Sequence, residues 1–250
     1  MSGWVVPGYA AGQELGRGPA GRTVLARHTA TGAAAVIRYL AIDETLRSRY
    51  RELARRLVGL RSPHVAELYE YVETDDGVAV VREYVSGASL SVVAAAGAMK
   101  PEHALTVLKG GLLGLGAGHA AGVGHGAYTP TNVLVDGTGR VTVTDFALAA
   151  IATGAPGLDE ATDRSAAVAM FHANLGGGRA DRLPRRLRGL PAALATAGEG
   201  ADPVADMLTE LEAAARKAYG ADWEAQGREK LGGLAARHAG RAPRRGRPDQ

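Results

Sequence analysis

The chain has 250 residues, of which 46% are hydrophobic, and a formal net charge of +3 at pH 7, a size that suits one large domain or two closely joined lobes. It contains no cysteine, which excludes a disulfide framework, a cysteine-ligated zinc site and a thiol nucleophile. No apolar run approaches the roughly 20 residues of a transmembrane helix and the start lacks a signal-peptide pattern, so we expect no membrane span and a cytoplasmic location.

The first 85 residues have the pattern of an antiparallel sheet with one helix. Short β-prone runs separated by turn residues predict strands at 9–15, 23–27, 33–40, 65–73 and 78–84. Apolar residues recur on one stripe between Leu46 and Leu60, which predicts a helix over 43–60. The Asp-Asp-Gly turn at 75–77 is a hairpin signal. We therefore expect an N-terminal lobe at 1–85.

Beyond this lobe the pattern becomes mainly helical. Pro101 opens a long helix that continues to about Ala121. Further helices are predicted at 163–175, 203–218 and 222–238, and short strands at 133–135 and 141–144. We expect a helical C-terminal lobe at 86–240. The segment 241–250 is rich in Pro, Gly and Arg, which predicts a disordered basic tail.

Three glycines in the N-terminal lobe, Gly16, Gly18 and Gly21, fit the pattern G-x-G-x-x-G. A dinucleotide-binding fold needs these glycines to open a helix, but the β-prone run 23–25 follows them at once. The pattern therefore favours a glycine-rich hairpin that covers phosphates. A glycine-rich hairpin without a ligand stays open as the alternative, and Pro19 removes one backbone donor from the loop.

The order of motifs resembles that of a bacterial, actinobacterial-type serine/threonine protein kinase domain. The resemblance covers residues 9 to about 177, and it rests on the glycine loop, Ala35-Val36-Ile37-Arg38, Ser62-Pro63-His64-Val65, Glu83-Tyr84-Val85-Ser86-Gly87, His125 to Asp136 and Asp145-Phe146-Ala147. It implies an α+β, two-lobed, protein-kinase-like fold, in which a small antiparallel N-lobe with one helix joins a larger helical C-lobe. It also implies ATP and magnesium as the family's cofactors.

The resemblance places unusual residues at the positions that carry out phosphoryl transfer. His125-Gly126-Ala127 stands where the family has His-Arg-Asp, so Ala127 replaces the carboxylate that accepts the substrate's proton. Thr129 replaces the lysine that contacts the transferred phosphate. We therefore expect no catalytic residue and read the chain as a pseudokinase, a binding, regulatory or scaffold module with a protein partner that the sequence does not identify.

The nucleotide positions are also altered. Arg38 replaces the strand lysine, and Leu53 occupies the position of its glutamate partner, so the usual ion pair is expected to be absent. Arg82 stands at the back of the adenine position, where it needs an anion such as Asp145 or Glu52. We expect Arg82 to obstruct the pocket, and ATP and magnesium to bind weakly or not at all.

The residues expected to contact any nucleotide are Gly16, Gly18, Gly21, Val24, Arg38, Arg82, Glu83 and Val85. Asn132 and Asp145 match the family's magnesium ligands. A structural carboxylate that caps the following turn is an equal alternative for Asp145. Ala147 replaces a glycine and restricts the backbone, and Ala166 is aligned with the aspartate that braces the catalytic loop in the family.

Other features carry weaker predictions. The histidines lack a second ligand at tight spacing, which argues against zinc. The arginine-rich run 182–188 is read as a solvated loop in preference to a nucleic-acid or acidic-partner site. Tyr219, Trp223 and Leu231 are expected to form a helical cap on the C-lobe, with a partner-binding face as the alternative.

Two enzymatic hypotheses remain beside the pseudokinase. An active serine/threonine kinase would need Asp136, Asp145 or Glu160 to supply the missing carboxylate, with transfer of the ATP γ-phosphate to protein. An aminoglycoside-type phosphotransferase would need the same catalytic-loop aspartate. Ala127 counts against both.

Overall fold

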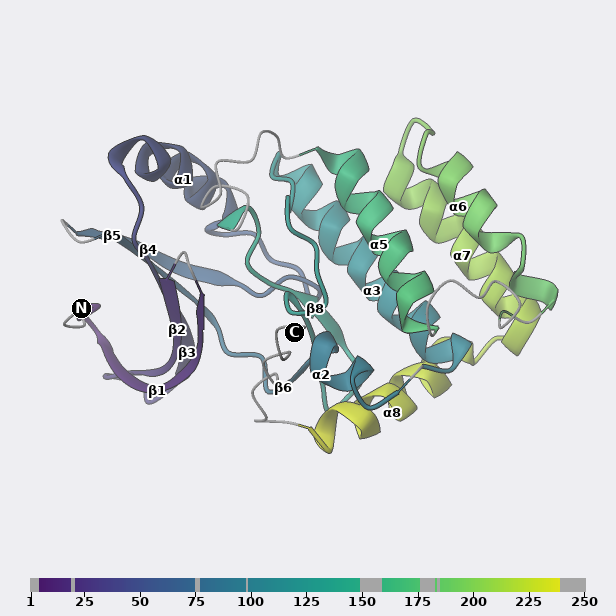
Figure 1. Ribbon diagram of the computed structural model, residues 1–250, viewed down its shortest axis with the longest axis horizontal. Helices are drawn as coiled ribbons and strands as arrows, with labels where there is room; N and C mark the ends of the chain where they lie inside the picture. Colours follow the sequence, from purple (N-terminus) through teal and green to yellow (C-terminus); the bar gives the residue numbers. More distant parts are fainter. Residues whose placement is uncertain are drawn as a thin grey trace, which may run out of the picture.

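The computed structural model describes residues 5–18, 21–74, 77–97, 99–148, 159–175, 183 and 185–238. The chain forms two lobes, a strand-rich N-terminal lobe with one helix and a mainly helical C-terminal lobe (Figure 1). This arrangement confirms the predicted two-lobed α+β fold. The proposed division at residues 85 and 86 falls in the short connection between a strand that ends at Glu83 and one that begins at Gly87.

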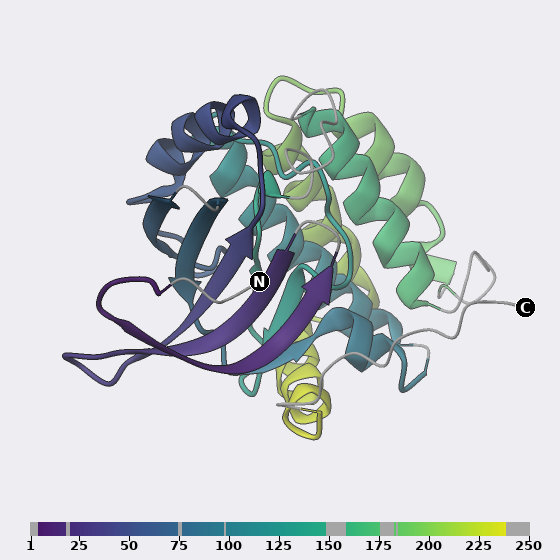
Figure 2. The same ribbon diagram turned by 60° about the vertical axis from the view of Figure 1, so that its left-hand side comes forward.

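The N-lobe is a five-stranded antiparallel sheet in the order β1-β2-β3-β5-β4. Its strands are β1 (Tyr9–Gly18), β2 (Gly21–His28), β3 (Ala34–Leu40), β4 (Leu68–Thr74) and β5 (Gly77–Glu83). The purple strands β1 to β3 lie side by side as a curved sheet in Figure 2. Successive side chains of a strand point to opposite faces of the sheet, so one face can serve a core and the other a cleft.

Helix α1 (Glu44–Leu57) packs on this sheet through a buried stripe that includes Tyr50, Leu53 and Leu57. Asp43 caps the helix, because its Oδ1 accepts a hydrogen bond from Leu46 N at 2.8 Å. The buried stripe confirms the helix that the apolar spacing predicted over 43–60, although α1 ends at Leu57.

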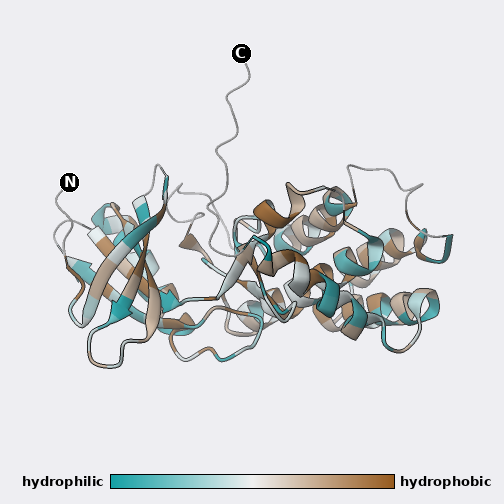
Figure 3. Cartoon of the chain, turned by 90° about the horizontal axis from the view of Figure 1, so that it is seen from below, coloured by the Kyte–Doolittle hydropathy of each residue, from teal (hydrophilic) through white to brown (hydrophobic). Residues whose placement is uncertain are grey.

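The C-lobe surrounds one long central helix, α3 (Pro101–Ala120), against which α5, α7 and α8 pack. The other elements are β6 (Gly87–Ser89), α2 (Leu90–Ala94), β7 (Val133–Asp136), β8 (Val141–Val143), α5 (Glu160–Asn174), a short 3-10 helix (Arg185–Leu187), α6 (Leu190–Ala197), α7 (Pro203–Tyr219) and α8 (Trp223–Ala236). Apolar residues gather on the helix faces that meet one another (Figure 3). None of the described helices is long and apolar enough to span a membrane.

Glycines in α3 allow β8 and the segment that follows it to approach this helix closely. A Cβ at Gly114 would lie 2.6 Å from a Val143 methyl, and one at Gly118 would lie 2.2 Å from the Phe146 ring. Larger residues at these positions would push away β8 and the segment that follows it. The glycine content of α3 therefore serves packing near the cleft at the cost of helix propensity.

The last two helices, α7 and α8, pack against α3. Trp223 is buried, and Lys109 of α3 binds Glu212 of α7 and Glu224 of α8. Leu231 is also buried, whereas Tyr219 is only half-buried. The expected packing of the C-terminal aromatic residues against the C-lobe is thus observed.

Candidate functional site

A cleft of about 540 Å³ lies where the two lobes meet, a size suited to a small-molecule ligand. Its lining comes from the β1–β2 hairpin, β3, the end of β5 and the connection after it, β6, the loop before β7, β7 and the segment after β8. These residues are Gln13, Glu14, Leu15, Gly16, Arg17, Gly18, Gly21, Thr23, Val36, Arg38, Arg82, Tyr84, Val85, Gly87, Ala88, Ser89, Ala127, Thr129, Thr131, Asn132, Leu134 and Asp145. The lining joins segments that are far apart in the sequence, and it contains most of the motifs named above.

Ten of the twelve site positions singled out from the sequence line this cleft: Gly16, Gly18, Gly21, Arg38, Arg82, Val85, Ala127, Thr129, Asn132 and Asp145. Val24 and Glu83 do not. Val24 is buried in a separate apolar cluster with Ile37 and Val81, and Glu83 turns its carboxylate toward Glu67 N at 3.3 Å. Their contact with a nucleotide therefore stays a prediction that the cleft lining does not support.

Motif reasoning did not single out the other twelve lining residues, and Thr23, Val36 and Leu134 are three of them. Because side chains alternate along a strand, the presence of Val24 in the core places Thr23 on the opposite, cleft-facing side. The same alternation places Val36 in the cleft beside the buried Ile37. Strand periodicity was the signal that could have found them.

Two arginines bind the one carboxylate at the inner end of the cleft. Arg38 Nη1 donates to Asp145 Oδ2 at 2.6 Å, and Arg82 Nε donates to Asp145 Oδ1 at 3.1 Å. The Asp145 side chain is 9% exposed and the Arg82 side chain 12%. Burial alone would raise the pKa of Asp145, but the charges of Arg82 and Arg38 hold that pKa below its ordinary value. We call these three residues the arginine clamp.

The clamp decides between the two anions considered for Arg82. Asp145 is its partner, whereas Glu52 lies on the exposed face of α1 and pairs with Arg56 at 3.2 Å. Leu53, at the position of the family's glutamate, is buried in the core. The expected absence of an ion pair between the β3 arginine and α1 therefore agrees with the geometry of the described residues.

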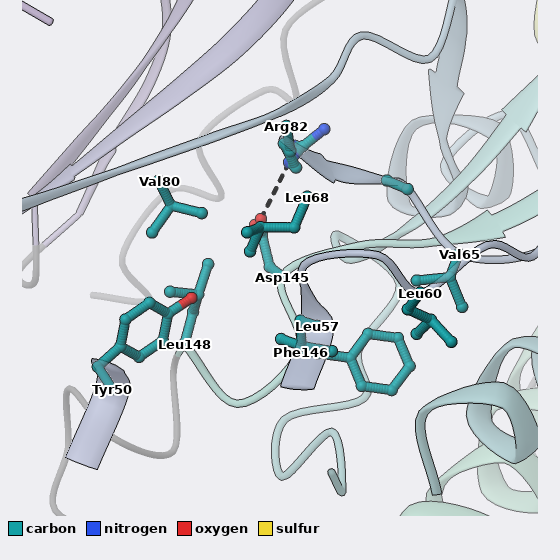
Figure 4. Close-up of a pocket in the computed structure, with 11 residues that line it drawn as sticks. Tyr50, Leu57, Leu60, Val65, Leu68, Val80, Arg82, Asp145, Phe146 and Leu148 are labelled. Atoms are coloured by element: carbon teal, nitrogen blue, oxygen red, sulfur yellow. Dashed lines mark hydrogen bonds and ion pairs between the residues drawn. The ribbon is translucent and has the colours of Figure 1, made fainter. Parts of the chain in front are cut away.

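A second, very small cavity of about 20 Å³ lies behind Arg82, just large enough for one water molecule. Figure 4 shows Tyr50, Leu68, Arg82, Asp145 and Phe146 around it, with Arg82 reaching Asp145 across its edge. Arg82 thus closes the rear of the cleft. It does not fill the front, where the 540 Å³ volume remains, so any obstruction by Arg82 is confined to the rear of the cleft.

The loop before β7 lacks a carboxylate at the position where the family places its base. Ala127 presents a methyl group to the cleft, and its carbonyl accepts a hydrogen bond from Asn132 Nδ2 at 3.0 Å. Thr129 is exposed, and its hydroxyl pairs with that of Thr131 at 2.8 Å. Neither side chain can accept a substrate proton as a carboxylate would, or contribute a positive charge.

The support of this loop is intact, contrary to expectation. Asp163 of α5 accepts hydrogen bonds from His125 N at 2.6 Å, from Gly126 N at 2.9 Å and from His119 Nε2 at 3.0 Å. The aspartate that braces the loop is therefore present, and the alignment with Ala166 was wrong. The two positions lie three residues apart on the same face of one helix, so periodicity alone could not separate them.

In the segment that follows Thr144, both Asp145 and Ala147 have left-handed backbone conformations, with φ angles of 63° and 58°. Ala147 lies where the family has glycine, and this conformation costs a residue with a Cβ about 1 kcal/mol. Its N–H donates to His125 O at 3.0 Å, which ties the segment to the loop.

Ala147→Gly is therefore expected to change the free energy of unfolding by less than about 0.5 kcal/mol, because relief of the left-handed strain offsets the loss of a buried methyl group. Ala167, equally buried but helical, is the matched control. Ala167→Gly is expected to cost about 2 kcal/mol from helix propensity and burial together. Chemical denaturation of both variants measures the difference, and equal losses would contradict it.

The donor set does not fit a magnesium ion. Both oxygens of Asp145 already accept from guanidinium groups. Asn132 donates only its Nδ2, to Ala127 O at 3.0 Å, and keeps its Oδ1 as a possible oxygen ligand. Mg²⁺ needs near-octahedral oxygen ligands, and at Asp145 it would also meet two positive charges. Within the described ranges there is no group of three or more His, Cys, Asp or Glu side chains that could hold a metal.

Several expected features fall outside the described residues. They are Pro19, the first two residues of the turn at 75–77, Arg182 and Pro184 of the arginine-rich run, and the tail 241–250. Within the described part of that run, Arg185 and Arg186 are exposed, and Arg186 donates to Lys217 O at 3.1 Å.

Comparison with known proteins agrees with this geometry. The profile of the protein kinase domain matches residues 9–166. CBL-interacting protein kinase 1 of Oryza sativa subsp. japonica is 32% identical over 57% of the chain and 32% of its own length. CBL-interacting serine/threonine-protein kinase 3 of Arabidopsis thaliana is 27% identical over 57% of the chain and 34% of its own length. The chain spans about a third of these curated relatives.

A solved structure also resembles the fold. The Mycobacterium tuberculosis PknI kinase domain superposes with a TM-score of 0.67 at 22% identity, and the match covers 86% of this chain and 99% of that one. At this identity the likeness establishes the fold alone.

Proposed function

The chain belongs to the protein kinase domain family, and from that premise we propose that it is a pseudokinase of the bacterial serine/threonine type, a module that binds or regulates and does not transfer phosphate. One observation carries the proposal. Ala127 lines the cleft where the family's catalytic base would lie, and a methyl group cannot accept the proton of a substrate hydroxyl.

The carboxylates considered as substitutes support this proposal by their positions. Asp136 accepts from Thr138 N at 2.8 Å and from Arg140 Nε at 3.1 Å, and so holds the turn between β7 and β8. Glu160 pairs with Arg164 on α5. Neither lines the cleft. Asp145 does line the cleft, but its carboxylate forms ion pairs with the guanidinium groups of Arg38 and Arg82.

We extend the proposal to the family's cofactors, ATP and magnesium, and infer that magnesium-bound ATP binds weakly or not at all. The arginine clamp places positive charge where the family holds its metal, and Thr129 supplies no cation for the transferred phosphate. The 540 Å³ of the cleft shows that volume is not the obstacle. The obstacle is the distribution of charge.

An active serine/threonine kinase is the second candidate, and the bracing of the loop by Asp163 favours it. An enzyme that keeps this brace keeps the shape of its catalytic loop. The shape alone does not supply a base, and the aminoglycoside-type phosphotransferase needs the same missing carboxylate. The brace is equally useful to a module that must present a folded surface.

A module without transfer activity acts by contact, so we propose a protein partner. The names of the plant relatives state that those kinases interact with CBL proteins. This chain covers only about a third of them, and its own partner is not thereby identified. Purification of the chain from its native host, followed by mass spectrometry of bound proteins, identifies the partner directly.

The proposal is tested by incubating the purified chain with radiolabelled ATP, magnesium and both generic and self substrates. Loss of a positioned acid–base group removes about 10²–10⁴ in rate, and the altered phosphate contacts remove more, so only background incorporation is expected. Stoichiometric incorporation that Asp145→Ala abolishes would overturn the pseudokinase proposal in favour of the active kinase.

A further inference from the structure

We propose that the inner end of the cleft binds a phosphate-bearing anion without a divalent cation, because the arginine clamp supplies the positive charge that a metal supplies elsewhere. This inference deepens the proposed function and rests on it, because a cleft that does not transfer phosphate has no need of a catalytic metal.

The charge balance of the cleft favours an anion. Its lining contains three arginines and two carboxylates. Arg17 and Glu14 neutralise each other at the glycine loop through an ion pair. At the inner end Arg38 and Arg82 share Asp145 alone, which leaves one positive charge in excess among the described residues. Such an excess in a partly enclosed site attracts anions.

Hydrogen-bond donors remain for such an anion. Of the Arg38 guanidinium, only Nη1 donates to another described residue, and its side chain is 25% exposed toward the cleft it lines. Nε and Nη2 are therefore available to phosphate oxygens, for which a planar guanidinium is well shaped. A Cβ placed on Gly16 or Gly18 would meet nothing within 4 Å, so the glycine loop, which lines the same cleft, leaves open space beside it.

A divalent cation gains nothing at this site. The carboxylate at the inner end of the cleft, that of Asp145, already accepts from two guanidinium groups at 2.6 and 3.1 Å. An ion of charge +2 would have to displace at least one arginine that the fold holds nearly buried, and would leave that arginine unpaired at a high cost. Magnesium bound to the ligand would also cancel the negative charge that the clamp recognises. Magnesium should therefore weaken binding.

The test measures binding by titration calorimetry and by thermal shift, with ATP and with tripolyphosphate, each in EDTA and in excess Mg²⁺. We expect both ligands to bind in EDTA at least about threefold more tightly than in Mg²⁺. ATP binds more tightly than tripolyphosphate if the apolar walls at Val36, Val85 and Leu134 hold its base, and equally if the phosphates alone are recognised. Either result supports the anion site.

Two variants separate this site from a metal-dependent one. Asp145→Asn removes the negative charge of the clamp, so affinity in EDTA should rise about threefold to tenfold, whereas a magnesium site would be lost. Arg38→Gln should lower the affinity in EDTA about tenfold, and it carries the test alone if the first variant is unstable. Arg49→Gln, on the exposed surface of α1, is the matched control and should change nothing.

Two results would contradict the proposed anion site. Binding that requires Mg²⁺ and disappears in Asp145→Asn would overturn the inference, and so would the absence of any binding of either ligand in EDTA. These results differ from a failure of the proposed function, which would appear as incorporated phosphate. A chain that transfers no phosphate and also ignores metal-free anions would refute the inference alone.

Discussion

Replacing Asp163 with asparagine is expected to lower the free energy of unfolding by about 3 kcal/mol, the largest loss predicted for one side chain. Asp163 is 1% exposed and accepts from His119, His125 N and Gly126 N. An asparagine NH₂ group would turn a donor toward at least one of these buried donors, and an unsatisfied buried polar group costs about 1–3 kcal/mol. Chemical denaturation measures the loss.

The same variant changes the dependence of stability on pH. Burial alone would raise the pKa of Asp163, but its hydrogen bonds with His119 and the two backbone amides hold the folded-state pKa below the ordinary 3.8. A depressed pKa contributes stability that is fully present above the unfolded-state value and is lost as the pH falls through the folded one. As the pH falls below about 4, the wild type should therefore lose stability more steeply than Asp163→Asn.

Thr162→Ala is the matched control for Asp163→Asn. Thr162 is exposed in the same helical turn, and its hydroxyl bonds only the capping Asp159 at 2.8 Å. The control should cost no more than about 1 kcal/mol. Similar losses in the two variants would show that Asp163 does not brace the loop.

Replacing Arg82 with methionine is expected to create a site that needs magnesium, with ATP affinity in Mg²⁺ raised about tenfold or more. The change frees Asp145 Oδ1, now held by Arg82 Nε at 3.1 Å, and leaves the carboxylate with Arg38 alone. One charge-assisted hydrogen bond corresponds to a factor of about ten or more in an equilibrium constant. Metal-free binding should weaken in the same variant, because the clamp loses one cation.

Thermal shift with 1 mM ATP measures this change. The wild type should show no magnesium-dependent rise in Tm, whereas a site with a Kd near 100 µM would add about 1.4 kcal/mol of stability. Arg55→Met, on the exposed face of α1 where the Arg55 side chain is 72% exposed, is the control. If Arg82→Met and the control respond alike to magnesium, Arg82 does not govern the metal position.

Local patterns in the sequence predicted most of the fold. The stripe from Leu46 to Leu57 lies on the buried face of α1, and the glycine hairpin joins two antiparallel strands. Boundaries were less accurate. The strand expected from residue 65 begins at Leu68, because Val65 instead forms an isolated bridge with Val143 of the C-lobe. A contact between residues so far apart in the chain leaves no local signal.

The site was predicted only in part, because its residues also come from segments that are far apart in the chain. Motif spacing led to Ala127, Asn132 and Asp145, which do line one cleft. The helix predicted at 163–175 begins earlier in the structure, because Asp159 caps it and Glu160 is its first residue. Asp159 followed directly by the acidic Glu160 was a capping signal that the sequence did contain.

The amino-acid sequence by itself determined which chemical groups this chain can use. It supplies neither a carboxylate at Ala127 nor a cation at Thr129, and it supplies cations at Arg38 and Arg82. Only the tertiary structure decided how these charges pair, since Arg38, Arg82 and Asp145 come from β3, β5 and the segment after β8. Electrostatic energy depends on distance and burial, and both are set by how the lobes pack.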